Sequence, residues 1–217
     1  MSTLLRKAVM ALMGLFLCVF LVVHLGGNLI LVLPPTDAQP LFNAYGELLS
    51  QSLLIKGVAW GLYAAMVAHI LDGFWIAALN RRAAGPRAQV DRRRALSPWY
   101  SRQMALLGTL ILVFLVVHMR DFWFVYTFGE VPVDAAGKRD LYTVVVTAFQ
   151  AEWYVLLHLF AFIALGFHLL HGVFSAAQTL GLHHPRLQRV ARLAGILFST
   201  TITAGFCAVA LVVHLQH

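Results

Sequence analysis

Long apolar runs alternate with short polar segments along this chain. Five runs carry few charges, at residues 8–33, 53–79, 104–128, 153–177 and 193–215. A helix of about 20 apolar residues spans the roughly 30 Å hydrocarbon core of a bilayer. A backbone in lipid must satisfy its own hydrogen bonds, so each run is predicted to be a helix. The pattern therefore predicts an all-α integral membrane protein, with five transmembrane helices in a single membrane domain over residues 1–217.

Composition supports this class and limits what else the chain can be. Of its 217 residues, 60% are hydrophobic and 12% are charged, which is roughly half the charged fraction of a soluble domain. The first apolar run has 26 residues, whereas the apolar region of a signal peptide has about 7–15, so we expect this run to remain as a helix. Cys18 and Cys207 have neither metal-site nor redox spacing and are predicted to pack inside helices.

The distribution of charges predicts the orientation of the chain. Twelve of the 16 Lys and Arg residues precede the first run or lie in the second and fourth connections, whereas seven of the nine acids lie on the opposite side. Short loops rich in Lys and Arg stay in the cytoplasm, so the N-terminus is predicted to be cytoplasmic and the C-terminus outside. The net charge of +7 follows from this topology, and it indicates an anionic lipid surface or a cytoplasmic protein partner, not a nucleic acid.

Four histidines, one in each of the first four runs, fall at two depths. At about 1.5 Å per residue, His24 and His118 lie ~24 Å and ~21 Å above the inner surface, while His69 and His168 lie ~15 Å lower. Ionisable residues at membrane depth indicate a functional site. Two histidines facing each other suit one metal centre, and bis-histidine ligation is typical of an electron-transfer haem. We therefore expect the first four helices to bind two haem b groups, an outer one at His24 and His118 and an inner one at His69 and His168.

Several glycines are placed to make room for a macrocycle. Gly73 and Gly172 each follow an inner histidine by four residues, on nearly the same helix face. Gly14 and Gly108 lie at the inner depth on the other two helices. Glycine in a membrane helix also serves close helix packing, and a lone histidine also serves to hydrogen-bond a neighbouring helix, so each residue has a structural alternative.

Other histidines compete for these roles. His158 lies at the outer depth, and His171 lies one turn after His168. Only one of the latter two can point at a given iron, so His171 is expected to meet a haem propionate. The tripeptide Val-Val-His occurs three times, and its third copy, which ends at His214, is predicted not to bind haem.

The histidine-bearing segments resemble a known family. They read FLVVHLGGN, AHILDGFWIA, VVHMRD and FHLLHGVFSAAQTLG in chain order. In this pattern the chain resembles the single-chain, five-helix, di-haem cytochrome b subunit that anchors succinate dehydrogenases and quinol:fumarate reductases. The resemblance covers nearly the whole chain and implies haem ligation by the same two histidine pairs. It also implies that the position of His171 is not a ligand.

The resemblance implies the rest of an enzyme complex. The chain would be a non-flavin subunit of a succinate:quinone oxidoreductase in a bacterial or archaeal cytoplasmic membrane. A flavoprotein with FAD and an iron–sulfur protein would dock on its cytoplasmic face. Electrons would pass between the iron–sulfur chain and a membrane quinone, often menaquinone, and the complexes could pair as dimers.

A quinone site needs hydrogen-bond partners for two carbonyls and a proton route. Near the outer layer the candidate quinone-binding residues are Asn28, Tyr45, Glu47 and Arg120. Glu47, placed at the start of the second helix, is the candidate for proton transfer, and its alternative is a solvated acid at a helix end. Arg120 is alternatively expected to pair with a haem propionate or with Asp121.

Within the apolar runs, Asp72 is the one carboxylate near the inner layer, and it is expected to pair with Arg81 or Arg82. Two rival functions remain open. One is the di-haem b anchor of a hydrogenase, nitrate reductase or formate dehydrogenase, which commonly takes two ligands from one helix. The other is a haem-free transporter or structural anchor. Transporters tend to have Gly/Pro-broken helices, whereas the seven prolines here all lie between the runs.

Overall fold

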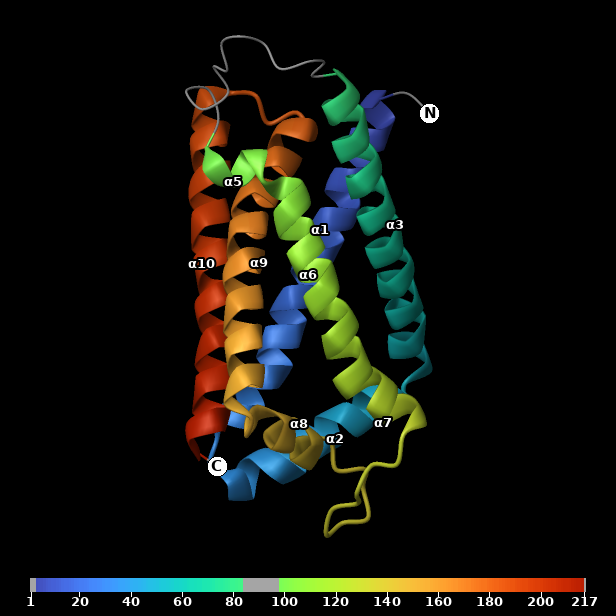
Figure 1. Ribbon diagram of the computed structural model, residues 1–217. Coiled ribbons are helices and arrows are strands. Elements are labelled where there is room, and N and C mark those ends of the chain that lie inside the picture. The colour runs from blue at the N-terminus through green and yellow to red at the C-terminus, as the bar shows by residue number, and fades with distance from the viewer. Residues whose placement is uncertain (1–2, 84–97, 217) are drawn as a thin grey trace.

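The computed structural model describes residues 3–83 and 98–216, most of them in helices. In chain order the helical elements are α1 (Thr3–Asn28), the 3₁₀ turn η1 (Leu29–Val32), α2 (Pro35–Gln51), α3 (Leu53–Ala83), α5 (Trp99–Arg102), α6 (Met104–His118), the π turn η2 (Met119–Phe124), α7 (Val125–Phe128), α8 (Leu141–Phe149), α9 (Glu152–Thr179) and α10 (Pro185–Gln216). The long helices run up and down, with the two termini at opposite ends (Figure 1). We call these the N-end and the C-end of the bundle.

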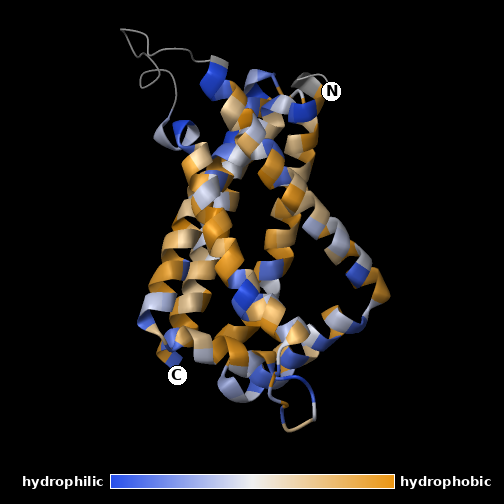
Figure 2. Ribbon diagram, turned by 45° about the vertical axis from the view of Figure 1, so that its right-hand side comes forward, coloured by the Kyte–Doolittle hydropathy of each residue, from blue (hydrophilic) through white to orange (hydrophobic). Residues whose placement is uncertain are grey.

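Within the described residues, five helical segments are long and apolar enough to cross a membrane, which confirms the five predicted spans. They are Leu5–Val32, Leu53–Arg82, Met104–Phe128, Glu152–Thr179 and Pro185–Gln216. Apolar residues cover most of the shafts, and polar residues gather toward the two ends (Figure 2). The fold is therefore consistent with a multi-pass membrane protein.

Several helices extend beyond the apolar runs. α1 begins at Thr3 and not at residue 8, and α10 begins at Pro185 and not at residue 193. Proline suits the first helical position because its missing N–H would have no partner there. The added turns are polar, since apolarity marks the part of a helix that lies in lipid and not the point where helical backbone stops. Four arginines of the predicted basic connection lie outside the described residues: Arg87, Arg92, Arg93 and Arg94.

Two helices at the C-end, α2 and α8, were not predicted. α2 buries Ala38, Phe42 and Gly46, which recur at every fourth position. α8 has only nine residues and buries Val145 and Phe149. Both helices lie across the end of the bundle, where they close it below the long helices (Figure 1). A search for long apolar runs misses such helices because they are short or half polar.

The third span is not one regular helix. α6 ends at His118, and Met119–Phe124 form a π turn before α7 begins. A π turn inserts an extra residue into a helix and is frequent at functional sites. Here it follows directly after His118, so it rotates the residues that come next to a different face of the helix.

The long helices are packed unevenly. α9 and α10 lie side by side along most of their length, and α1 and α6 pack against α9 (Figure 1). α3 contacts mainly α1, and no residue in its most apolar stretch is buried. α3 is therefore the most peripheral of the five spans.

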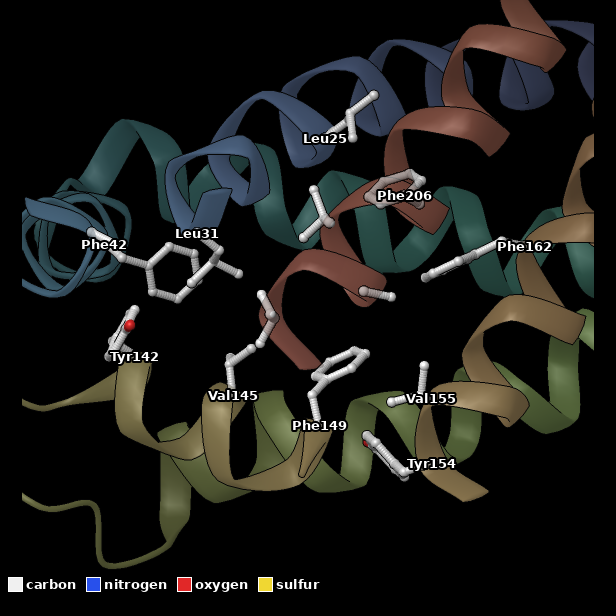
Figure 3. Packing of buried hydrophobic residues seen from close by; sticks show 14 of the residues in the cluster. Leu25, Leu31, Phe42, Tyr142, Val145, Phe149, Tyr154, Val155, Phe162 and Phe206 are labelled. Atoms are coloured by element: carbon white, nitrogen blue, oxygen red, sulfur yellow. The ribbon is translucent and has the colours of Figure 1, made fainter. Parts of the chain in front are cut away.

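The buried core lies toward the C-end of the bundle. It joins Leu31 of η1, Phe149 of α8 and Phe206 of α10, among other apolar side chains (Figure 3). Cys18 and Cys207 are free thiols that pack against this core, as the sequence predicted. The core thus ties the two capping helices to the spans.

A polar network fastens α2 and α8 to the hairpin between α7 and α8. Asn43 is 1% exposed and donates to Asp134 Oδ2 (3.0 Å) and Asp140 Oδ1 (2.9 Å). The side-chain oxygen Oδ1 of Asn43 accepts from the backbone N–H of Tyr142 (3.0 Å). Asp140 caps α8 by accepting from the N–H and the hydroxyl of Thr143 (3.1 Å and 2.6 Å). We call this network of Asn43, Asp134, Asp140 and Thr143 the C-end latch.

The carboxyl groups of the latch are held in their charged form. Burial alone would raise the pKa of Asp140, but the hydrogen bonds from Thr143 and Asn43 outweigh it and the pKa lies below its usual value. The pKa of Asp134 is also lowered, chiefly by a backbone N–H of the hairpin. Both groups therefore bind protons less readily in the folded protein than in the unfolded chain.

Candidate functional site

The histidines of the first four spans meet in two pairs. The rings of His24 (α1) and His118 (α6) have centroids 5.9 Å apart and lie at 89° to each other. The rings of His69 (α3) and His168 (α9) have centroids 6.2 Å apart and lie at 68°. These are the two pairs that helix depth indicated, and in each pair the residues come from different helices. We call His24 and His118 the C-end pair, and His69 and His168 the N-end pair.

Aromatic side chains enclose the C-end pair. His24 stacks on Phe20, with 5.1 Å between centroids, and lies 5.6 Å from Phe206. His118 lies 5.0 Å from Phe122, which belongs to the π turn. These contacts restrict the orientation of both imidazole rings, because the neighbouring rings come from three different elements.

A third histidine, His158, joins the C-end pair. It is 1% exposed, and its ring centroid lies 6.1 Å from that of His118. Its Nδ1 lies 2.9 Å from the backbone carbonyl oxygen of Tyr154, so this nitrogen carries the proton and donates it. Its Nε2 is buried and has no hydrogen-bond partner within the described residues. The sequence predicted His158 at the outer depth as a competitor of the paired histidines, and the structure brings it against His118.

Glycines border the N-end pair. A Cβ added to Gly14 of α1 would lie 3.5 Å from Cε1 of His69, and one added to Gly108 of α6 would lie 3.7 Å from Cε1 of His168. Side chains longer than a methyl group would press on these rings. Among ring contacts of the described residues, His69 and His168 contact only each other. The two glycines thus lie beside the pair, at the depth that the sequence indicated.

The other two glycines, Gly73 and Gly172, do not lie against a histidine ring. A Cβ on Gly73 would meet Met10 at 3.4 Å, and one on Gly172 would have nothing within 4 Å. Neither therefore has an imidazole beside it, and their predicted role in lining a cofactor stays a prediction. His171 is half-buried one turn after His168, and its predicted contact with a propionate is likewise a prediction.

The two pairs fit a haem held by two axial imidazoles. Two imidazoles bound to one metal at about 2 Å have ring centroids roughly 6 Å apart, as both pairs do. Nδ1 of His69, His118 and His168 is buried without a hydrogen-bond partner in the described part of the chain, which is costly for a polar group. Within residues 3–83 and 98–216 no three His, Cys, Asp or Glu side chains gather as metal ligands.

Two predicted quinone-binding residues lie where α1 ends and α2 passes. The side-chain amide of Asn28 donates to the backbone carbonyl of His24 at 2.8 Å. The ring of Tyr45 lies against Gly27 so closely that any Cβ there would collide with it. Burial raises the pKa of Tyr45. Asn28 therefore supports the helix turn that carries His24, while Tyr45 fixes α2 against α1.

Glu47 was predicted to begin the second span, and this prediction is wrong. It belongs to α2, which ends at Gln51 because Ser52 is extended, and α3 begins at Leu53. Its carboxylate binds Lys138 Nζ at 2.7 Å and accepts from Gln51 Nε2 at 2.9 Å. The ion pair raises the pKa of Lys138. Glu47 is thus a partly exposed acid on the capping layer.

Arg120 forms one of its two predicted partnerships. Its Nε donates to Asp121 Oδ1 at 2.6 Å, and its side chain is 67% exposed. The other oxygen, Asp121 Oδ2, accepts from the hydroxyl of Tyr154 at 3.0 Å. Tyr154 is buried beside His158, with 4.4 Å between ring centroids. The sequence analysis did not select Tyr154, since a tyrosine near the start of a span is also typical of an interfacial anchor.

Asp72 pairs with a different helix from the one predicted. Its Oδ1 lies 3.7 Å from Arg6 Nη1 of α1, and the predicted partners were Arg81 and Arg82. Those two lie nine and ten residues further along α3, which is about 14 Å on one helix and too far for a side-chain pair. The ion pair joins α3 to α1 near the N-end.

Comparison of the chain with protein-family models, with curated proteins and with solved structures found no match. The proposed function therefore rests on the residues of this chain and on their geometry.

Proposed function

We propose that the chain is the di-haem cytochrome b subunit of a succinate:quinone oxidoreductase, either a succinate dehydrogenase or a fumarate reductase. The observation that carries this proposal is the meeting of two imidazole pairs, each from two different spans, at two levels of one bundle. One histidine per helix in this order is also what the resemblance of the four histidine segments implies. The rival anchors that take two ligands from one helix fit this arrangement less well.

Each histidine pair would hold one haem from opposite sides. A bis-histidine haem supplies one-electron transfer without an open coordination position. The C-end pair would be kept in orientation by its aromatic neighbours, whereas the N-end pair would depend on the space left by Gly14 and Gly108. In this proposal the chain positions two redox centres and excludes water from them.

The N-end would face the cytoplasm. Basic residues gather there at the start of α1, the end of α3 and the start of α10, while most acids lie at the C-end. Positive residues on short connections favour a cytoplasmic location. The iron–sulfur and flavoprotein subunits would dock on this basic face, and the N-end pair would exchange electrons with the iron–sulfur chain. The membrane would then be a bacterial or archaeal cytoplasmic membrane.

Quinone, menaquinone in the first instance, would react near the C-end pair. Asn28, Tyr45, Glu47 and Arg120 remain the candidate residues for it. Glu47 is bound to Lys138 and partly exposed, so it is suited to exchanging protons with water on that side. The side-chain amide of Asn28 uses one of its two N–H groups on the carbonyl of His24, so the other would be available to a quinone oxygen.

The test is substrate-dependent haem reduction in the intact complex. The tagged chain is purified from its own membranes with its partner subunits, and succinate is added under anaerobic conditions. The proposal expects the b-type absorption bands of reduced haem to appear, and expects succinate to have no effect when His69→Ala removes the N-end haem. A Leu215→Ala variant, changed at an exposed position near the opposite end of α10, is the control.

Two results would contradict the proposal. Reduction by hydrogen or formate but not by succinate would assign the chain to another respiratory anchor. A complex without haem would contradict electron transfer altogether and favour a structural anchor or transporter.

A further inference from the structure

A surface hollow of about 280 Å³ lies between α1 and α3 near the N-end. Its walls include Arg6 and Val9 of α1, and Leu71, Asp72 and Trp75 of α3. One water molecule takes about 30 Å³ of liquid volume, so the hollow admits a considerably larger group.

The hollow opens where the bundle meets lipid. Leu71 and Trp75 are 64% and 55% exposed, and both lie in the span Leu53–Arg82. Arg6 lies at the very start of the span Leu5–Val32. Tryptophan and arginine are typical of the membrane–water interface, where a side chain touches acyl chains and head groups together. A phospholipid would place its head group and the upper part of its acyl chains against these side chains at the same time.

The hollow presents one positive and one negative group side by side. Arg6 Nη1 and Asp72 Oδ1 are 3.7 Å apart, which is longer than the 2.7–2.9 Å typical of a direct charged hydrogen bond. The guanidinium of Arg6 also lies over the ring of Trp75, 4.9 Å from its centroid. A ligand that carries both a positive and a negative group would complement this arrangement.

One oxygen of Asp72 lacks a donor. Oδ2 is buried and has no hydrogen-bond partner in the described part of the chain. Nδ1 of His69, one turn earlier on α3, is buried and unpartnered as well, but no hydrogen bond joins the two atoms. A buried carboxylate oxygen without a donor is costly, so the site calls for an N–H or O–H group.

We propose that this hollow binds the head group of a phospholipid with a free ammonium group, of the phosphatidylethanolamine class. The ammonium donates to the carboxylate of Asp72, whose side chain is 17% exposed, and the phosphate accepts from the guanidinium of Arg6. Val9 and Leu71 contact the acyl chains. A trimethylated head group has no N–H to donate, and an anionic head group without an amine leaves the carboxylate unpartnered.

The test compares lipids that differ only in N-methylation. The purified full-length chain in detergent is mixed with equal amounts of dioleoyl-phosphatidylethanolamine and dioleoyl-phosphatidylcholine, and retained lipid is counted by native mass spectrometry. We expect the ethanolamine lipid to be retained about tenfold more than the choline lipid, because a hydrogen bond to a charged group is lost on methylation.

Variants locate the preference. Asp72→Asn should bring the ratio of the two lipids close to one, and Arg6→Gln should lower retention of both. Asp72→Glu, which keeps the carboxylate, should retain part of the preference. The matched controls are Lys7→Gln, beside Arg6 but exposed and not lining the hollow, and Asp37→Asn at the other end of the bundle. Both controls should behave like the unchanged chain.

Four results would overturn the proposal. Equal retention of the two lipids by the unchanged chain would mean that no ammonium is recognised. A preference that survives Asp72→Asn would place the lipid elsewhere. Displacement of both lipids by dioleoyl-phosphatidylglycerol would show that Arg6 simply attracts negative charge. If Asp72→Asn alters the haem spectrum but not lipid retention, Asp72 serves His69 instead. None of these readouts depends on succinate, so the lipid site and the proposed function fail separately.

Discussion

The two histidine pairs of this bundle are built in opposite ways. The C-end pair is surrounded by aromatic rings and by a third histidine, and it lies next to the buried core and the capping helices. The N-end pair is bordered by glycines and involves α3, which is the most peripheral span. Side chains of the chain surround the C-end pair, whereas glycines leave space beside the N-end pair.

This difference predicts different responses to substitution. At the C-end, the geometry of the pair depends on packing, and the latch between α2, α8 and the hairpin holds that packing in place. At the N-end, the geometry depends on small residues and, under the proposed function, on the haem that would lie between the helices. A cofactor that binds the folded but not the unfolded state stabilises the folded state. We therefore expect removal of haem to disturb the N-end more than the C-end.

The largest expected effect comes from removing one histidine of each pair. His24→Ala and His69→Ala should each remove one of two haems, and the two variants should lose different components of the absorption spectrum. Because α3 is held mainly through α1, we also expect His69→Ala to expose α3 more to proteolysis. Haem quantification per chain and limited proteolysis measure both effects. Loss of both haems from either variant would show that the two pairs are not independent.

A smaller effect is expected when the space at the N-end is filled. Gly14→Leu places a side chain against His69 and should lower N-end haem occupancy without affecting the C-end haem. Gly26→Leu is the matched control on the same helix, because nothing lies within 4 Å of a Cβ there. Equal haem content in the two variants would contradict the role given to Gly14.

Breaking the latch tests the C-end. Asn43→Ala removes three hydrogen bonds of a buried side chain, two of them to carboxylates, and should destabilise the capping layer by about 3 kcal/mol. Amide hydrogen exchange in α8 should accelerate by roughly 100-fold, since 1.4 kcal/mol is a factor of ten. Gln51→Ala, on the exposed side of α2, should change exchange in α8 little. Similar rates in both variants would argue against the latch.

The smallest expected effect is a pH dependence of the same layer. The pKa values of Asp140 and Asp134 are lowered in the folded protein, so their stabilisation is complete above the unfolded pKa of about 3.9 and is lost as pH falls below it. Protection of α8 amides, corrected for intrinsic exchange, should stay constant from about pH 7 to 5 and decline below about 4. Asp140→Asn should weaken this dependence. A decline that is already complete above pH 5 would contradict the role given to the two carboxylates.

Much of the bundle could be predicted because the bilayer imposes a simple rule on apolar length. Depth along each helix, at a fixed rise per residue, was enough to group His24 with His118 and His69 with His168. The same arithmetic placed Gly14 and Gly108 beside the N-end pair. These predictions succeed because they concern positions along straight helices.

The features that could not be predicted from the sequence depend on contacts between helices. α2 and α8 are short amphipathic helices whose apolar faces matter only once the end of the bundle exists to receive them. The partner of Asp72 lies on another helix, and the ends of α1 and α10 extend past the apolar runs. His158 has the depth of a ligand, and its donation to Tyr154 could be found only from the coordinates.

The central claim is that two histidine pairs each hold one redox centre. The most direct measurement is a dithionite-reduced minus oxidised spectrum of the purified chain, made with ample haem supply, together with haem quantification per polypeptide. The account predicts about two low-spin b-type haems per chain, one for each pair. A chain that folds into its bundle and binds no haem would contradict the account.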